Sequence, residues 1–105
     1  MSNYQLVYVT CPSREEAKEL AQGAVEAKLA ACANIVPQIE SVFHWEDKVQ
    51  SSTESLLILK TTKTNFEKLQ AFIEEKHSYY CPCVLGLDIA DLNSKFAEFI
   101  TSSVS

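Results

Sequence analysis

The chain has 105 residues, a formal net charge of −5 at pH 7 and a hydrophobic content of 47%. This length predicts a single domain over residues 1–105, with enough apolar residues for a packed core. The acidic balance argues against nucleic acid and anionic membranes as partners, because both attract basic proteins. No apolar run is long enough to span a bilayer, and no secretory signal is visible at the N-terminus. The sequence therefore predicts a cytoplasmic protein, whose four cysteines are expected to be thiols rather than disulfides.

The first part of the chain predicts a strand and an amphipathic helix. Residues 4–10 are rich in β-branched and aromatic side chains, which favour a strand. Ser13 and Glu16 have the spacing of a capping box, which predicts a helix from there to about Leu29. Its inner face can lie close to a sheet because it consists mostly of small residues at helical spacing: Ala17, Leu20, Ala21, Ala24 and Val25.

A long alternating segment then predicts a hairpin. Over residues 33–45 the side chains alternate with period two, placing residues 35, 37, 39, 41, 43 and 45 on one face of a strand. Residues 46–48 or 50–52 can each hold the reversal, because both clusters are polar. Residues 53–62 return as a strand whose core, residues 56–59, is expected to be buried on both faces. Pro37 has no N–H and is expected to mark an edge, a bulge or a kink.

The length of this hairpin predicts self-association. A strand over residues 33–45 would be roughly 40 Å long at about 3.3 Å per residue, whereas a compact domain of this size is roughly 34 Å across. The hairpin is therefore expected to project past its own domain. An exposed edge rich in large apolar residues aggregates unless it is covered. We expect another copy of the chain to cover it, with Ile39, Phe43 and Trp45 at the interface.

The second half of the chain completes a recognisable order of elements. Thr64 and Glu67 have the spacing of a second capping box, which predicts a helix to about His77. An irregular link over 78–83 precedes a strand over 84–89 and a short helix over 93–100. Strand, helix, strand, strand, helix and strand in this order form the split βαβ pattern. The sequence thus predicts an α+β, ferredoxin-like βαββαβ fold with an extended β-hairpin and a C-terminal helix.

Several spaced motifs carry a family resemblance. They are the run KLAACANIVP over residues 28–37, then Ser41, Trp45-Glu46 and Lys48, and finally Leu59-Lys60-Thr61. Together they resemble the CutA family, the divalent-cation tolerance proteins. The resemblance spans nearly the whole chain, and it implies a ferredoxin-like fold, a tightly interlocked homotrimer, and association with copper and other divalent metals.

Cys32 lies in the matched motif Leu-Ala-Ala-Cys, where the resemblance implies copper contact in some relatives. Two interpretations stay open for this residue. A free cysteine between small residues is typical of an inert core position, whereas a thiolate is a ligand that suits Cu(I). Cys11 lies near another such family position, and a third cysteine of the set has no counterpart in the helix over 64–77. A transferred three-cysteine copper site is therefore not expected.

The segment His77-Ser78-Tyr79-Tyr80-Cys81-Pro82-Cys83 departs from the family pattern of His-Pro-Tyr-Glu, a spacer and Pro-Glu. Tyr80 and Cys83 replace the two glutamates, while Cys81 adds another thiol. The resemblance implies that this segment and the lysine of Lys-Thr line a pocket between subunits, here Tyr79 and Lys60. The loss of carboxylates disfavours hard cations, so any bound metal is predicted to be copper or zinc. No metal is predicted to be an essential cofactor. The candidate ligands are Cys32, His77, Cys81 and Cys83.

Structural interpretations of the same residues remain open. Cys83 shares the parity of Leu85, Leu87 and Ile89 and can equally point into the core, while His77 can cap its helix. Lys60 can pair with Glu54, with Glu46 or with an anionic ligand.

No nucleophile triad, phosphate loop or zinc-protease motif occurs, so the chain is predicted not to be an enzyme. We therefore predict a trimeric CutA-like protein that responds to metal ions and binds copper. The alternative is a very stable structural trimer or signalling scaffold that binds a protein or a small anionic ligand at the subunit interface.

Overall fold

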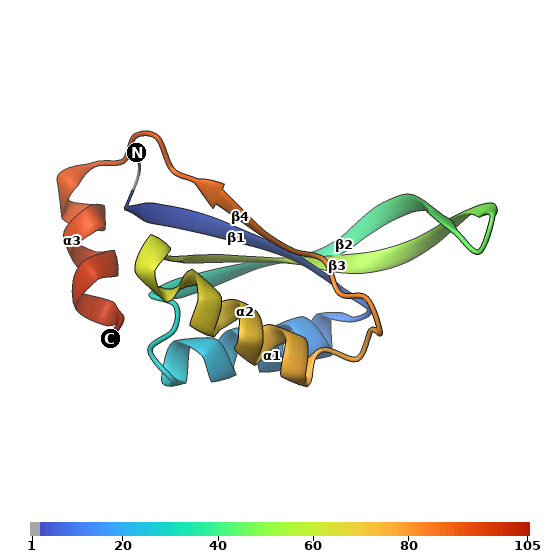
Figure 1. Cartoon of the computed structure of the whole chain (residues 1–105), viewed down its shortest axis with the longest axis horizontal. Helices are drawn as coiled ribbons and strands as arrows, with labels where there is room; N and C mark the ends of the chain where they lie inside the picture. Colours follow the sequence, from blue (N-terminus) through green and yellow to red (C-terminus); the bar gives the residue numbers. More distant parts are fainter. Residues whose placement is uncertain (1–2) are drawn as a thin grey trace.

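The computed structural model describes residues 3–105 and has a mixed α+β fold (Figure 1). The elements are β1 (Tyr4–Cys11), α1 (Arg14–Glu26), β2 (Cys32–Trp45), β3 (Lys48–Thr62), a 3₁₀ turn (Lys63–Asn65), α2 (Phe66–Lys76), β4 (Val84–Asp88) and α3 (Ser94–Ser103). The four strands form one antiparallel sheet in the order β2-β3-β1-β4. Helices α1 and α2 lie together on one face of the sheet, and α3 lies at one end (Figure 1). The predicted order of elements is confirmed.

The ends of α1 follow from local hydrogen bonds. Ser13 Oγ accepts a bond from the N–H of Glu16 at 3.2 Å, which confirms the predicted N-cap. The helix stops earlier than predicted because Lys28 adopts a left-handed conformation, with φ of 60°. The Lys28 N–H then bonds to the carbonyl of Val25 and the Leu29 N–H to that of Ala24. This is a Schellman motif, which ends a helix by satisfying its last carbonyls.

The second predicted capping box is wrong. Lys63–Asn65 form the 3₁₀ turn, α2 begins only at Phe66, and no side chain caps its first turn. Such turns commonly lead into helices and satisfy some of the first backbone groups themselves.

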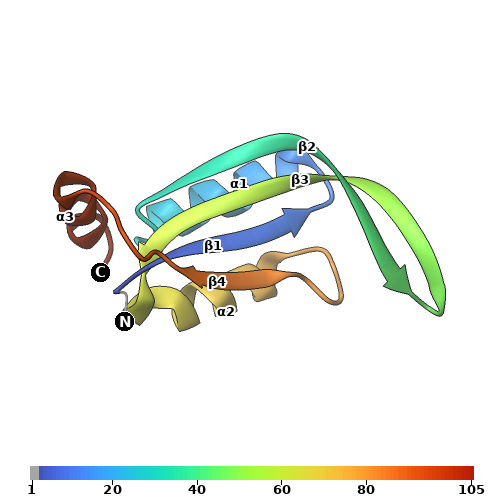
Figure 2. The same cartoon turned by 90° about the horizontal axis from the view of Figure 1, so that it is seen from above.

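The hairpin projects from the body of the molecule as predicted (Figure 2). Glu46 and Asp47 both have positive φ, 52° and 63°, which is the two-residue turn that matches strand twist best. The reversal therefore lies in the first of the two polar clusters. Strand β1 pairs with β3 only from Ser55 onward, so residues 39–54 pair with one another alone. We call residues 39–54 the arm. The molecule measures 44 × 26 × 22 Å along its principal axes.

A bulge at Pro37 changes the phase of β2. Val36 pairs with Leu56 and Ile39 with Glu54, so Pro37 and Gln38 together stand opposite Ser55. The hydroxyl of Ser55 donates a hydrogen bond to the Pro37 carbonyl at 2.7 Å. The prediction for Pro37 is thereby confirmed. The prediction that residues 35, 37, 39, 41, 43 and 45 share one face is wrong for Ile35, because side chains before and after a bulge are out of phase.

The core lies between the sheet and the two helices. Most of its fully buried members lie on β1, β3, α1 and α2, and they include Val7, Val9, Leu57, Leu59, Ala17, Ala24, Leu69 and Ile73. At Gly86 of β4, an added Cβ would lie 2.7 Å from the ring of Phe66. Gly86 therefore faces α2 and lets that helix approach the sheet closely.

The opposite face of the sheet is apolar and largely open; we call it the open face. Because Gly86 faces α2, its neighbours Leu85 and Leu87 face the other way, and they are 51% and 47% exposed. Leu56 and Ile58 also lie on this face and are only partly buried, so the prediction that residues 56–59 are buried on both faces is wrong for the single chain. Cys83 precedes β4, and its side chain is half-buried.

Two further features complete the fold. Helix α3 packs at one end of the open face, where the Tyr4 hydroxyl and Thr101 Oγ1 are 2.8 Å apart. Within residues 3–105, no helix is long and apolar enough to cross a membrane.

Candidate functional site

The candidate site is a pocket of about 670 Å³ between the arm and the segment that leads into β4. We call it the arm pocket. Its walls carry the aromatic side chains of Phe43, Trp45, Tyr79 and Tyr80, and the thiols of Cys81 and Cys83. The fold thus brings together residues predicted as interface and residues predicted as metal ligands, from segments more than thirty positions apart.

Glu54 of β3 supplies the negative charge of this pocket. It is only 7% exposed, and its Oε2 accepts a hydrogen bond from the Tyr79 hydroxyl at 2.7 Å. Burial raises the pKa of Tyr79, and the hydrogen bond and charge of Glu54 raise it further. Tyr79 therefore stays a neutral donor. From the sequence, Glu54 is expected only as a partner of Lys60, although a carboxylate just before a run of buried apolar residues is itself a signal of a polar site.

His77 anchors the segment that carries the thiols. Its ring lies 2.8 Å from the Thr10 carbonyl through Nε2, and Nδ1 accepts a bond from the Tyr79 N–H at 3.1 Å. Because a carbonyl can only accept, Nε2 must carry the proton and the neutral ring satisfies both contacts. A metal would have to displace one of them. His77 does not line the arm pocket, and this arrangement gives it a structural role.

Glu16 completes this anchor from the helix side. Its Oε2 accepts a hydrogen bond from the Ser78 N–H at 3.1 Å and lies 3.4 Å from His77 Nδ1. In a complete capping box this side chain would turn back to the N–H of Ser13. Instead it bonds to the segment after α2, so one residue of the predicted capping box holds the site together. Nothing in the local sequence pattern signals this contact.

The cysteines fall into different environments. Cys81 is exposed and Cys83 is half-buried. Burial raises the pKa of Cys83, as do the charges of Glu54 and Cys81. Cys11 is fully buried below the sheet, and burial, together with Glu16 and Glu54, raises the pKa of its thiol to about 12. Cys11 is therefore a neutral core residue, whereas Cys81 and Cys83 are accessible.

Cys32 and Lys60 lie elsewhere on the sheet. They are directly opposite each other on β2 and β3. The Lys60 ammonium donates to Asn34 Oδ1 at 2.5 Å and lies 5.7 Å from the centroid of the Phe96 ring. Glu54 is six residues away along β3, roughly 20 Å at about 3.3 Å per residue. Lys60 and Tyr79, predicted to share a pocket between subunits, therefore do not meet within one chain.

The four predicted metal ligands do not form one site in the single chain. In the part of the chain that the structure describes, no three His, Cys, Asp or Glu side chains are placed to hold a metal ion. Cys81 and Cys83 lie together at the arm pocket, while Cys32 and His77 are separate from them.

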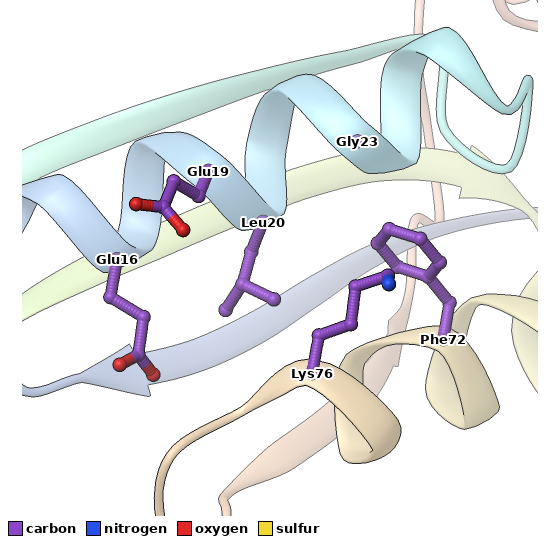
Figure 3. A pocket seen from close by; sticks show the side chains of 6 residues that line it. All are labelled: Glu16, Glu19, Leu20, Gly23, Phe72 and Lys76. Atoms are coloured by element: carbon purple, nitrogen blue, oxygen red, sulfur yellow. The ribbon is translucent and has the colours of Figure 1, made fainter.

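A second, smaller pocket of about 260 Å³ lies between α1 and α2 (Figure 3). The Phe72 ring lines this pocket and approaches α1 so closely that a Cβ at Gly23 would lie 2.7 Å from it. The Lys76 ammonium lies 5.4 Å from the centroid of the same ring, and Glu16 and Glu19 stand on the α1 side (Figure 3). None of the predicted site residues lines this pocket, so the arm pocket is the better candidate.

Comparisons with known proteins identify the family. A family model described as "CutA1 divalent ion tolerance protein" matches residues 5–103. The chain is 48% identical over 98 residues to "Protein CutA, chloroplastic" of Arabidopsis thaliana, covering 93% of this chain and 54% of that protein. It is 38% identical over 101 residues to "Divalent-cation tolerance protein CutA" of Archaeoglobus fulgidus, covering 96% of this chain and 98% of that protein.

Solved structures agree with this result. The crystal structure of CutA1 from Oryza sativa matches with a TM-score of 0.95 at 42% identity, covering 99% of this chain and 95% of that chain. The chain spans about half the length of the plant relatives it matches. Their names, together with a structure from Archaeoglobus fulgidus described as periplasmic, place relatives in more than one compartment. The family match covers nearly the whole chain, and the chain belongs to the CutA1 divalent ion tolerance protein family.

Proposed function

We propose that this chain is a metal-responsive protein that binds Cu(I) or Zn²⁺ through thiolates and does not catalyse a reaction. The observation that carries the proposal is that Cys81 and Cys83 both line the arm pocket. Thiolates suit Cu(I) and Zn²⁺, whereas Mg²⁺ and Ca²⁺ require oxygen ligands. Relatives named for divalent-cation tolerance support a response to metal ions.

The proposed assembly is a cytoplasmic homotrimer of ferredoxin-like subunits. The strand order β2-β3-β1-β4, with both long helices on one face, supports the ferredoxin-like topology. Large apolar side chains on the open face and the arm support self-association, because exposed patches of this kind mark interaction surfaces. Leu85, Leu87, Phe43 and Trp45 are each between 40% and 51% exposed in the single chain. Neighbouring chains would also supply ligands that one chain lacks.

The oligomeric state is directly measurable. Light scattering on a size-exclusion column is expected to give about three times the chain mass of 11.7 kDa. The physical reason is the open apolar face, which costs free energy while it contacts water. A monomer at micromolar concentration would contradict the proposed assembly.

Metal binding is tested by titrating the reduced protein with Cu(I) against a competing chelator. The variant Cys81→Ser/Cys83→Ser is expected to lose tight binding, whereas Cys32→Ser is expected to retain it. Thiols must lose a proton before they bind metal, and the pKa of Cys83 is raised by burial. Affinity should therefore fall as the pH is lowered, and no variant should bind Mg²⁺ specifically.

The opposite result in this titration would place the copper site at another residue. If Cys32→Ser loses tight copper and the double variant keeps it, the ligand is Cys32 and the interpretation of residues 81–83 is wrong. If no variant binds copper tightly, the second candidate function is favoured. That function is a structural or signalling trimer that binds a small anion at Lys60, whose ammonium on the open face has only Asn34 and the Phe96 ring as partners among the described residues.

A further inference from the structure

The starting observation is that two hydrogen-bond acceptors face each other beside the helices. His77 Nδ1 lies 3.4 Å from Glu16 Oε2. Glu16 Oε2 accepts the main-chain N–H of Ser78 at 3.1 Å, and His77 Nδ1 accepts that of Tyr79, also at 3.1 Å. Because His77 Nε2 donates to the Thr10 carbonyl, Nδ1 carries no proton in this arrangement. The space between the two acceptors is therefore a place where one proton can bind.

Binding of that proton would exchange one contact for another. The charged ring of His77 would donate from Nδ1 to Glu16 Oε2, and a charge-assisted hydrogen bond would replace a contact between two acceptors. Nδ1 would then have no lone pair for the N–H of Tyr79, because both nitrogens of an imidazolium ring are donors. This N–H is part-buried, and leaving it without an acceptor costs free energy. The peptide group before Tyr79 would have to turn or move.

The contacts lie within one chain and do not depend on what covers the open face or the arm. The His77 side chain is 0% exposed in the single chain, so a neighbouring copy cannot bury it further. The Glu16 side chain is 20% exposed and gives a proton a route from solvent. The hydrogen bonds of the pair join α1, the end of β1 and the segment after α2.

Ionisable groups from four elements and from the segment itself surround the ring. They are Glu16 from α1, Cys11 from β1, Glu54 from β3, Lys76 from α2 and, on the segment, Tyr79. The charges of Glu16 and Glu54 both raise the pKa of the Cys11 thiol, so their negative potential reaches the end of β1. The Lys76 ammonium lies over an aromatic ring of the smaller pocket. A proton bound by the pair thus adds positive charge beside two carboxylates.

We propose that Glu16 and His77 form an acid-sensitive switch: one proton bound between their side chains releases the N–H of Tyr79 and loosens residues 78–83. The proton comes from solvent and stays on Nδ1, in an ion pair with the carboxylate. Histidine ordinarily changes its charge between about pH 5 and 8, so the switch operates in a range that cells encounter. At the upper end of this range the segment is held by both main-chain bonds, and at the lower end by the Ser78 bond alone.

Ser78 makes the switch a property of this chain rather than of the family pattern. The pattern has proline at this place, and proline has no N–H to donate. With Ser78, a hydrogen bond holds the carboxylate of Glu16 beside the ring. The inference goes beyond the proposed metal function, because it concerns a proton and holds whether or not Cys81 and Cys83 bind copper.

The experiment follows the ring and the amide by NMR in the full-length, reduced protein with a chelator present, between about pH 5 and 8. The ¹⁵N shifts of the His77 ring report which nitrogen carries a proton, and His44→Gln assigns them by removing the signals of the other histidine. We expect Nε2 alone to be protonated at high pH and Nδ1 to gain a proton as the pH falls.

Hydrogen exchange measures the release of the segment over the same pH range. The protection of the Tyr79 amide, corrected for the intrinsic exchange rate at each pH, is expected to fall at least tenfold as Nδ1 gains its proton. The Val7 amide is the internal control, because Val7 lies in the middle of β1 and pairs with both neighbouring strands. Its protection should stay constant, which shows that the fold persists.

Two variants assign the effect to the pair. Glu16→Gln keeps the shape and can still accept from the Ser78 N–H, so it should fold. It is expected to weaken proton binding at His77 about tenfold or more, since it removes an opposite charge at close range. The Tyr79 amide should then stay protected to lower pH. Glu19→Gln removes the same charge from an exposed position one turn along α1, and it should titrate like the wild type.

Each of three results would overturn the proposal. The first is a His77 ring that takes up no proton in this range, and the second is proton uptake without loss of protection at Tyr79. The third is equal weakening by Glu16→Gln and Glu19→Gln, which would assign the effect to the general charge of α1. Cys81→Ser/Cys83→Ser should titrate like the wild type even if it loses copper, so failure of the metal proposal and failure of this one are distinguishable.

Discussion

Replacement of Trp45 by alanine is expected to separate the assembled protein into single chains at concentrations where the wild type stays intact. Trp45 is 46% exposed at the end of the arm, on the side that faces away from α1 and α2. Truncating a central aromatic anchor of an interface typically costs about 2–4 kcal/mol. In a trimer the loss occurs three times, because each chain supplies one copy.

Dilution followed by light scattering measures this effect directly. Val49→Ala is the matched control, since Val49 is 75% exposed on the opposite side of the same arm. The control should remain assembled at every dilution that the wild type tolerates. If Trp45→Ala also remains assembled, Trp45 faces solvent in the assembled protein and does not anchor the interface.

Leu57→Ala is expected to cause a large loss of stability within a chain, about 2–5 kcal/mol in the free energy of unfolding. Leu57 is fully buried in the middle of β3, where it stands opposite Val9 of β1 and Ile35 of β2. Its loss leaves a cavity between three strands and the helices. Because the free energy of unfolding of a domain is only about 5–15 kcal/mol, this variant is expected to be marginally folded.

Urea denaturation at a fixed protein concentration measures this loss, because the stability of an oligomer depends on concentration. The control is Val42→Ala on the arm, which removes aliphatic atoms from a side chain that is 71% exposed. It should shift the midpoint only slightly. A similar midpoint for both variants would mean that Leu57 is not part of a tightly packed core.

The order of elements and the projecting hairpin were predictable, because both follow from local properties of the chain. Helical spacing, period-two alternation and the Ser13 cap require only neighbouring residues. The face on which each arm residue lies was not predictable, because Pro37 is compatible with an edge strand, a bulge or a kink, and only a bulge shifts the alternation. The bulge places Ile35 toward the helices and Ile39 toward the open face, two residues of the same parity that the alternation assigned to one side.

The sequence predicted which residues belong to the candidate site, but not how they are arranged. The sequence singled out Tyr79, Cys81, Cys83 and Trp45, and the fold places all four around one pocket. The contacts that position them join residues about 60 positions apart, such as Glu16 and Ser78, and no local pattern encodes them. Leu85 and Leu87 suggested that one face of this strand is buried. Their hydrophobicity indicates that the face is covered, but it does not tell whether the same chain or another chain covers it.

The two-residue turn at Glu46 and Asp47 also sets the timing of folding. Strands β2 and β3 follow each other directly, so the arm can close within about 1–10 μs, as hairpins do. Strands β1 and β4 must instead bring together residues as distant as Gln5 and Asp88, and such long-range pairing is slow. The arm is therefore expected to form before the body of the chain, and in the proposed trimer its aromatic side chains would stay uncovered until another chain arrives, at a rate set by concentration. If the proposed trimer forms, the local concentration of newly made chains would then set how long these side chains are exposed to wrong partners.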